Sequence, residues 1–398
     1  MGSSDDVKSV MIIAGEASGD MHGAKLVRAM WNKRKKMVFF GIGGQALKNT
    51  GVNVLMDSSL ISVVGITEIV PKIPHILNGM ALARELLKKI RPDLLILIDF
   101  PDFNLRVAEH AKKLDIPVLY YISPQIWAWR PGRVKKIGNL VDHVAVILPF
   151  EEKFYRKHNV PATFVGHPLL DSGHICHIDP GSNGSGSSIR PDNENSDNPL
   201  TIGLLPGSRD REVTSLLPDM IRAANIIGKK HPEIRFLVSV APSVENRLVK
   251  EVAEQAGISA KIDFWEKGVE EIFEQSALVI AASGTVTLQS AIYKTPMVVI
   301  YKVSFLSYLI GRLMIRVDHI SLVNLIAEAR IAPELIQDEA SGENIAQTVL
   351  NIIDTPGRLN IMKRQLSGIR NRLGGSGASS KVADIAIDML HKFHMGGK

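Results

Sequence analysis

The chain has 398 residues, a formal net charge of +6 and a hydrophobic content of 45%. This length suggests two domains, and the hydrophobic content suffices for two cores, which excludes a wholly disordered chain. The single cysteine, Cys176, excludes an internal disulfide and favours a reducing compartment. No apolar run is long enough to span a bilayer, and residues 1–6 are unlike a signal peptide, so we expect a cytoplasmic protein.

The positive charge is compatible with nucleic acid, an anionic membrane or phosphorylated small molecules as partners. Nucleic-acid readers usually combine a basic stripe with aromatic residues. Aromatic residues make up only 6% of this chain, and its densest basic run, residues 33–36, is short. We therefore do not expect a nucleic-acid partner.

The first half alternates short apolar runs with helical patterns, which is typical of parallel α/β structure. A helix is expected at about 23–32, and strands are expected at 10–14, 38–42, 94–99, 117–122 and 144–147. Such continuous apolar strands indicate a parallel sheet that helices cover on both faces.

A polar stretch at 179–199, rich in Gly, Ser, Asn, Asp and Pro, interrupts this pattern and is interpreted as a mobile insertion. Beyond it we expect strands at 201–205, 236–240, 278–281 and 297–300, and helices at 343–353, 358–372 and 380–393. The predicted division is a first domain at 1–175, a linker at 176–199, a second domain at 200–355 and closing helices at 356–398.

The turn at 14–23 lies between a strand and a helix, at the sheet edge where open α/β folds bind ligands. Its glycines allow close backbone approach, and Glu16, Ser18 and Asp20 offer hydrogen-bond acceptors. The acidic residues disfavour a bare phosphate here. The alternative is that Ser18 or Asp20 only caps a helix.

A second strand of the first half ends in the sequence IDFPDFN at 98–104. A carboxylate at the end of a buried strand is unfavourable unless it is paired or functional. Asp99 is therefore the candidate general base, and Asp102 is a candidate for capping or orienting a group. A structural Asp99, tied to backbone N–H groups, is the alternative.

Two further strand-to-helix turns, at 206–209 and 282–289, occur in the second half. Free N–H groups at a helix N-terminus, together with a guanidinium, form a site for pyrophosphate. Two such loops suggest a nucleoside diphosphate, and ordinary turns and caps are the alternative. The candidate residues are Gly207, Ser208 and Arg209 in the first loop and Ser283, Gly284 and Thr285 in the second.

Residues 123–130 contain Trp127 and Trp129 beside the basic Arg130. These side chains can stack on a sugar or bind phosphate, and interface packing is the alternative. We expect no metal site, because neither Asp-x-Asp nor His-x-x-x-His occurs. The apolar segments 60–74 and 305–316 can lie in a membrane interface or receive acyl chains, with core packing or a dimer contact as the alternative.

Taken together, these motifs resemble those of the lipid-A-disaccharide synthases. The matching segments, in the family's order, are GEASGD at 15–20, IDFPDFN at 98–104, SP and WAWR within 123–130, LPGSR at 205–209 and ASGT at 282–285, with LPFE at 148–151, VGHP at 165–168 and PMVV at 296–299. The resemblance covers about residues 10–390.

The resemblance implies a glycosyltransferase-B fold, an α/β architecture of two Rossmann-like domains that face each other across a cleft. It also implies an inverting transfer of 2,3-diacylglucosamine from UDP-2,3-diacylglucosamine to 2,3-diacylglucosamine 1-phosphate (lipid X). The products are the β-1,6-linked disaccharide 1-phosphate and UDP. No cofactor or metal is expected, since helix dipoles and Arg209 would stabilise the diphosphate.

In this reading Asp99 is the base and Glu16 and Ser18 orient the substrate. Family positions also carry over to Asn324 in the donor site, and the acceptor-site candidates are Asp102, Trp127, Trp129 and Arg130. The chain departs from the family pattern at three positions, with Gln289 in place of Glu, Val323 in place of Pro and Glu328 in place of Gly. The first departure concerns the ribose hydroxyls and the other two the loop around Asn324.

The resemblance further implies a peripheral protein on the cytoplasmic face of the inner membrane of a Gram-negative-type cell. The closing helices either pack back on the first domain or are exchanged in a homodimer. Two alternatives stay open: a UDP-N-acetylglucosamine 2-epimerase or related sugar-nucleotide enzyme of the same fold, and a non-catalytic, membrane-associated nucleotide-sugar binder.

Overall fold

The computed structural model describes residues 7–61, 69–129, 132–171, 200–303 and 319–395. The chain divides into two compact units, the first made of Met1–Ser172 with Leu373–Lys398 and the second of Gly173–Arg372. The whole expected insertion at 179–199, the whole apolar segment 305–316 and residues 62–68 of the apolar segment 60–74 lie outside the described residues. Within those residues, no helix combines the length and apolar content needed to cross a membrane.

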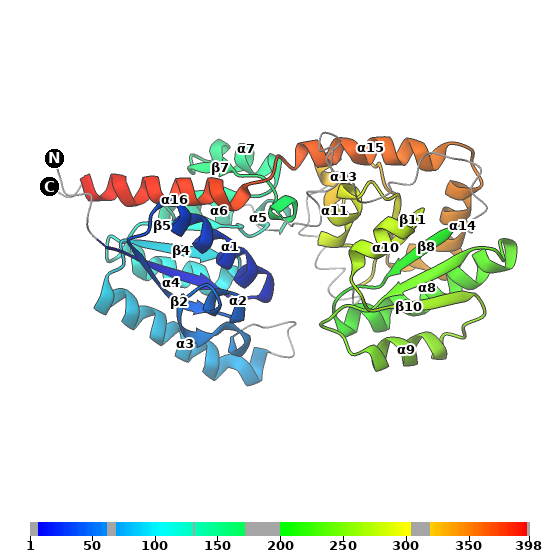
Figure 1. The fold of residues 1–398 in the computed structure, drawn as a ribbon, viewed down its shortest axis with the longest axis horizontal. Coiled ribbons are helices and arrows are strands. Elements are labelled where there is room, and N and C mark those ends of the chain that lie inside the picture. The colour runs from blue at the N-terminus through cyan, green and yellow to red at the C-terminus, as the bar shows by residue number, and fades with distance from the viewer. Residues whose placement is uncertain (1–6, 62–68, 130–131, 172–199, 304–318, 396–398) are drawn as a thin grey trace. The chain divides into compact units, whose positions relative to one another are not determined.

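The first unit is built on a parallel sheet with the strand order β3-β2-β1-β4-β5-β6-β7 (Figure 1). The strands are β1 (Lys8–Ala14), β2 (Met37–Gly43), β3 (Asn53–Asp57), β4 (Leu94–Ile98), β5 (Val118–Tyr121), β6 (His143–Val146) and β7 (Ala162–Phe164). The helices are α1 (Ala17–Lys33), α2 (Gln45–Lys48), α3 (Ile69–Ile90), α4 (Pro101–Lys112), α5 (Ile126–Trp129), α6 (Arg133–Leu140), α7 (Pro149–Lys157) and α16 (Ala378–Met395). All five expected strands are confirmed, and the two additional ones, β3 and β7, lie at the sheet edges.

Alternate residues of β1 serve two cores, because successive strand side chains point to opposite faces. Met11 and Ile13 join a cluster on the face covered by α3, α4 and α6, whereas Val10 and Ile12 join a cluster with α1 and α16. Both faces of the sheet are therefore covered, as continuous apolar strands require.

Helix α16 packs on α1 within the first unit of the same chain. Asp171 caps its N-terminus, with one carboxylate oxygen accepting from the N–H of Gly377 at 2.6 Å and the other from the N–H of Ser379 at 3.1 Å. The return to the first unit begins at Leu373, so α15 (Arg358–Arg372) belongs to the second unit and only α16 to the first. The expected boundary near 356 thus lies one helix too early.

The second unit contains a parallel sheet with the strand order β10-β9-β8-β11-β12-β13. Its strands are β8 (Thr201–Leu205), β9 (Arg235–Ser239), β10 (Lys261–Trp265), β11 (Leu278–Ala282), β12 (Met297–Tyr301) and β13 (Glu334–Ile336). Its helices are α8 (Asp210–Lys230), α9 (Asn246–Gln255), α10 (Val269–Gln275), α11 (Thr285–Ile292), α13 (Leu322–Ala327), α14 (Gly342–Ile353) and α15. Again the four expected strands are confirmed and the two additional ones, β10 and β13, are edge strands.

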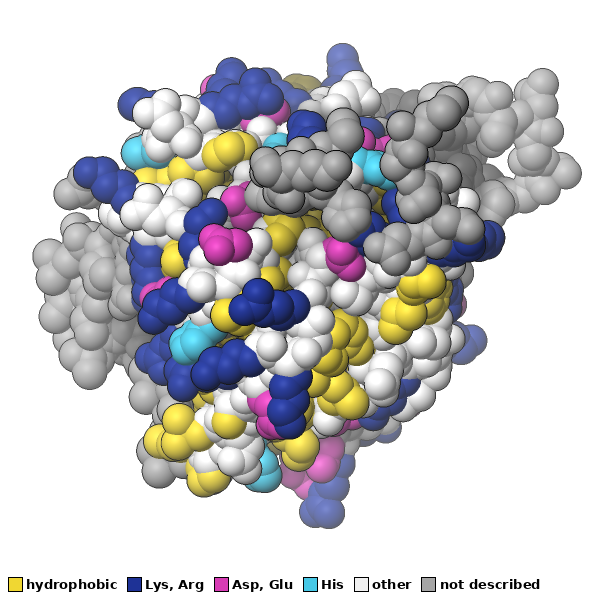
Figure 2. All heavy atoms as spheres, turned by 90° about the vertical axis from the view of Figure 1, so that its left-hand side faces the viewer, with side chains coloured by type: hydrophobic (Ala, Val, Ile, Leu, Met, Phe, Trp, Pro, Cys, Tyr) yellow, Lys and Arg dark blue, Asp and Glu magenta, His cyan; other side chains and the backbone are white. Residues whose placement is uncertain are grey.

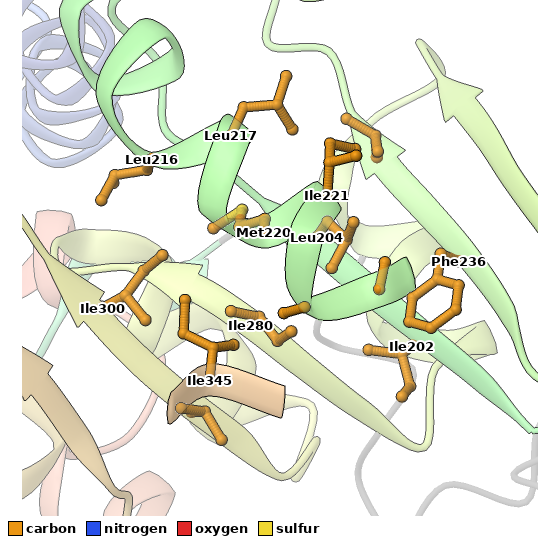
Figure 3. Close-up of a cluster of buried hydrophobic side chains, with 14 of the residues drawn as sticks. Ile202, Leu204, Leu216, Leu217, Met220, Ile221, Phe236, Ile280, Ile300 and Ile345 are labelled. Carbon is orange, nitrogen blue, oxygen red and sulfur yellow. The ribbon is translucent and has the colours of Figure 1, made fainter. Parts of the chain in front are cut away.

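Figure 3 shows the main core of this unit, where Ile202, Ile280 and Ile300 from three neighbouring strands face side chains of α8 and α14. Met220 and Ile345 meet these strands from the two helices. This packing keeps the strands side by side, so that their carboxyl ends lie along one edge of the sheet. The loops that carry the predicted motifs of this unit follow these ends.

Candidate active site

Asp99 occupies a sharp turn between β4 and α4. Asp99 and the next residue, Phe100, both have φ near +48°, a backbone conformation that residues other than glycine rarely adopt. The turn is held because the backbone carbonyl of Asp99 accepts hydrogen bonds from the Tyr120 hydroxyl at 2.7 Å and from Nδ2 of Asn104 at 2.6 Å. Two consecutive strained residues held in this way indicate a site where the backbone conformation serves function.

The Asp99 carboxyl group has the electrostatic properties of a general base. Burial raises its pKa from 3.8 to about 6, and the negative charge of Glu16 adds to this rise. Glu16 precedes α1, and β1 lies beside β4 in the sheet, so the fold brings the two predicted residues together. A base with a pKa near the working pH is suited to remove a proton in a transition state.

The loop around Glu16 is shaped by close packing. A side chain at Gly15 would place its Cβ 2.2 Å from the ring of Phe100, so only glycine fits there. Ser18 is exposed on the first turn of α1, close in sequence to Glu16. Asp20 has the capping role, although for α2 rather than α1, because it accepts from the N–H groups of Gly44 and Ala46 at 2.6 and 2.8 Å.

The acceptor-site candidates differ in their surroundings. The exposed Asp102 forms an ion pair with Arg133 at 3.0 Å. Trp127 is partly buried and its indole Nε1 donates to Glu151 at 3.0 Å. Trp129 lies in α5, and Arg130 lies outside the described residues.

A pocket of about 520 Å³ lies at the carboxyl ends of the strands in the second unit. It is lined by seven of the predicted donor-site residues, which are Gly207, Ser208, Arg209, Ser283, Gly284, Thr285 and Gln289. A Cβ added at Gly284 would meet no atom within 4 Å, so the backbone at the start of α11 is open to a ligand. The geometry matches an anion-binding helix N-terminus beside a guanidinium.

Glu212 organises the Arg209 loop. Its Oε2 accepts from the N–H of Ser208 at 2.9 Å, and its Oε1 lies 3.2 Å from Nη1 of Arg209. Gly207 has φ of 116°, and a Cβ there would lie 2.2 Å from Glu212 Oε2. Both the loop conformation and the contact with Glu212 therefore require glycine at 207.

Asn324 is fully buried and does not line the described pocket. Its amide bridges Ala332, donating to the carbonyl at 2.8 Å and accepting from the N–H at 2.9 Å, and it also donates to Glu334 at 2.8 Å. Glu334 additionally accepts from the N–H and the hydroxyl of Ser321. Asn324 thus supports the loop beside α11 through these hydrogen bonds, and its expected contact with UDP stays a prediction.

Several residues that the sequence analysis did not single out take part in these sites. Tyr120 supports the Asp99 turn, Glu151 holds Trp127, and Trp265 and Glu270 line the pocket. Trp265 ends β10, so recognising that strand would have marked it as a ligand-facing position. The described residues contain no group of three or more His, Cys, Asp or Glu side chains arranged to hold a metal ion.

Several solved enzyme structures have a similar fold. A putative UDP-N-acetylglucosamine 2-epimerase from Listeria monocytogenes has a TM-score of 0.64 at 13% identity, with 98% of this chain and 97% of that chain covered. MurG from Acinetobacter baumannii has a TM-score of 0.55 at 13% identity, with 96% and 99% covered. At these identities the likeness shows the fold alone, two Rossmann-like α/β domains.

The sequence comparisons are more specific. Lipid-A-disaccharide synthase from Syntrophus aciditrophicus is 44% identical over 385 residues, covering 97% of this chain and 98% of that protein. The enzyme of the same name from Geobacter sulfurreducens is 41% identical, covering 96% and 97%. The lipid-A-disaccharide synthetase family matches residues 10–381, and these residues include both the Asp99 turn and the lining of the pocket. This chain therefore belongs to the lipid-A-disaccharide synthase family.

Proposed function

We propose that the chain is an inverting glycosyltransferase that transfers 2,3-diacylglucosamine from UDP-2,3-diacylglucosamine to 2,3-diacylglucosamine 1-phosphate. The products are the β-1,6-linked disaccharide 1-phosphate and UDP. The observation that carries the proposal is the Asp99 carboxyl group, whose pKa burial raises to about 6 in a strained turn at a strand end. Membership of the family supplies the substrate class.

Asp99 is the general base of this mechanism. Its carboxylate takes the proton from the acceptor hydroxyl while that oxygen attacks the anomeric carbon from the face opposite UDP. One displacement on an α-linked donor gives the β-linked product. Glu16 and Ser18 border the same site and orient the sugar, and Glu16 also keeps the pKa of Asp99 high enough for proton transfer.

The pocket of the second unit stabilises the departing UDP. The open backbone at the start of α11 and the Arg209 guanidinium supply positive potential where negative charge develops. Arg209 is 59% exposed, and its ion pair among the described residues is with Glu212, so its guanidinium can turn from Glu212 to the diphosphate. A pair with this exposure contributes only about 0–1 kcal/mol, so the exchange is easy.

Binding of the acceptor is assigned to the first unit. Trp127 supplies a flat surface for the sugar ring, with Trp129 and Arg130 beside it in sequence. Asp102 holds Arg133 in an ion pair on the same unit, and this cation suits the phosphate of the acceptor.

We also propose a peripheral association with the cytoplasmic face of the inner membrane, because both substrates carry acyl chains. Leu60, Ile73 and Leu77 expose 44%, 44% and 61% of their surfaces around the start of α3. Separately from these three residues, Figure 2 shows one face of the molecule on which Lys and Arg side chains lie among hydrophobic ones, a combination that suits an anionic lipid surface. A homodimer is part of the same proposal, and exchange of α16 would replace its contact with α1 of its own chain by the equivalent contact with the second copy.

The direct test is an assay with both acylated glucosamine substrates in detergent, with mass spectrometry of the products. We expect the disaccharide 1-phosphate and UDP in equal amounts. Release of a C2 epimer of the sugar would instead support an epimerase, and UDP-sugar binding without turnover would support a non-catalytic binder. Either result would contradict the proposed function.

A further inference from the structure

The nucleotide pocket of the second unit contains one carboxylate whose role the proposed mechanism leaves open. Two acidic side chains line this pocket, Glu212 and Glu270. Both oxygens of Glu212 are engaged by the Arg209 loop. Glu270, by contrast, has no hydrogen bond or ion pair to any residue that the structure describes. Its carboxylate is therefore available to a ligand.

Glu270 lies beside Gly268 on the wall of the pocket. It lies in the first turn of α10, and its Oε2 is 3.1 Å from the point where a Cβ on Gly268 would stand. Gly268 itself has φ of 115° and also lines the pocket. The carboxylate thus lies over the backbone of a residue on the pocket wall, which glycine keeps open.

A second helix approaches the same region. Gln289 lines the pocket from α11, and Tyr293, the C-cap residue of that helix, follows Gln289 by four residues. Burial raises the pKa of Tyr293 to about 12, and the negative charge of Glu270 contributes to this rise. Glu270 and Gln289 therefore border the pocket together from two different helices.

A bound nucleoside diphosphate presents two kinds of groups to such a pocket. Its phosphates need donors and positive charge, which the Arg209 loop and the start of α11 supply. Its ribose carries two adjacent hydroxyls, and a carboxylate has two oxygens that accept from both of them. An amide such as that of Gln289 has one accepting oxygen and can hold only part of this pair.

We propose that Glu270 accepts hydrogen bonds from the ribose hydroxyls of the bound nucleotide and selects ribonucleotides over deoxynucleotides. Gln289 holds the same sugar from the other side. This assignment rests on the proposed function, since that function makes UDP the ligand of the pocket. It makes Glu270 a specificity-determining residue of this chain, at a site where the family's usual glutamate is replaced by Gln289.

Glu270 also lies where a negative charge stabilises a helix N-terminus, and this purely structural role needs a control. Glu271 provides it, because it is the next residue, lies in the same first turn and does not line the described pocket. Substitution of either residue by glutamine removes the same charge from the same helix end.

The experiment is calorimetric titration of the full chain with UDP and with 2′,3′-dideoxy-UDP, which tests binding without requiring turnover. The wild type should bind UDP about 10- to 100-fold more tightly than the dideoxy compound, as expected for charge-assisted hydrogen bonds. Glu270→Gln should reduce this ratio at least about fivefold, by weakening the binding of UDP alone. Glu271→Gln should leave the ratio unchanged.

One further variant and two possible outcomes complete the test. Glu270→Asp keeps the charge on a shorter side chain, so its ratio should fall between those of the wild type and Glu270→Gln. Failure of the wild type to bind UDP would contradict the proposed function and this assignment together. Binding of UDP with a ratio that Glu270→Gln leaves unchanged would contradict the assignment of Glu270 alone.

Discussion

The indole Nε1 of Trp127 donates a hydrogen bond to Oε1 of Glu151 at 3.0 Å, and this contact restrains the orientation of the indole ring. Glu151 is only 1% exposed, and its Oε2 accepts from the N–H of Leu148 at 3.0 Å. Phe150 meets the Trp127 ring edge to face at a centroid distance of 4.7 Å. The segment at 148–151 thus serves the tryptophan that we assign to the acceptor site.

Replacing Glu151 by glutamine tests this relationship. An amide has one accepting oxygen, so either the Trp127 or the Leu148 donor loses its partner, and the free energy of unfolding should fall by about 1–3 kcal/mol. We also expect a higher KM for the acceptor with an unchanged KM for UDP-sugar. Glu152→Gln is the control, because it breaks the ion pair of the neighbouring residue with Arg156 and leaves the Trp127–Glu151 hydrogen bond in place. Equal acceptor KM values in the two variants would contradict the account.

The pH dependence of turnover should follow Asp99. Its carboxyl group acts only when deprotonated, and its pKa is raised to about 6, so kcat/KM should fall about tenfold per pH unit below 6. Glu16→Gln removes a negative charge that raises this pKa, so the half-point should shift to lower pH. Glu109→Gln, on the surface of α4, should leave the profile in place. An acid limb that Glu16→Gln does not move would argue against Asp99 as the titrating group.

Alanine substitutions at Gly207 and Gly257 distinguish the effect of a steric conflict from that of an unfavourable backbone conformation. Both have positive φ, 116° and 78°, but a Cβ at Gly207 would collide with Glu212, whereas one at Gly257 would meet no atom within 4 Å. Gly207→Ala should weaken UDP binding at least about tenfold because the Ser208–Glu212 hydrogen bond cannot form. Gly257→Ala should lower stability by only about 1–2 kcal/mol and leave the UDP affinity as it is. The UDP affinities of the two variants are measured by calorimetry. Equal affinities would contradict the role assigned to Gly207.

Asn324 and Glu334 should behave as a coupled structural pair. Because both are buried and bonded to each other, Asn324→Ala and Glu334→Gln should each lower the free energy of unfolding by about 2–4 kcal/mol. The double variant should lose less than the sum of the two single losses by at least about 0.5 kcal/mol. Glu339→Gln, exposed in the same region, serves as the control. Strict additivity, measured by denaturant unfolding, would show that Asn324 acts in another way.

Sequence patterns predicted the inner strands of both sheets because each of these strands contains a run of apolar residues. The strands that escaped prediction, β3, β7, β10 and β13, are all at sheet edges. β3 and β10 contain no fully buried residue, and β7 and β13 have only three residues each. Edge strands are half solvated, so they lack the continuous hydrophobic signal of a buried strand.

Candidate site residues that lie in a turn after a strand could be predicted from the sequence. Contacts between residues that are distant in the chain could not. Asp99 and the Gly207–Arg209 loop come soon after strands, so the expected strand order was enough to predict that they lie at the carboxyl edges of the sheets. Glu151 and Trp127 are 24 residues apart, and only the fold brings them into contact. The structural role of Asn324 likewise depends on Glu334, which no local motif connects to it.

The most direct test of the central claim is the rate of disaccharide formation by Asp99→Asn. Asparagine tolerates positive φ, so the turn should persist while the base is lost. Asp115→Asn is the matched control, since Asp115 is exposed and has φ of 55°. We predict that kcat falls by about 10²–10⁴-fold in Asp99→Asn and by less than about twofold in Asp115→Asn. A folded Asp99→Asn variant that keeps the wild-type rate would contradict the claim that Asp99 is the general base of this transfer.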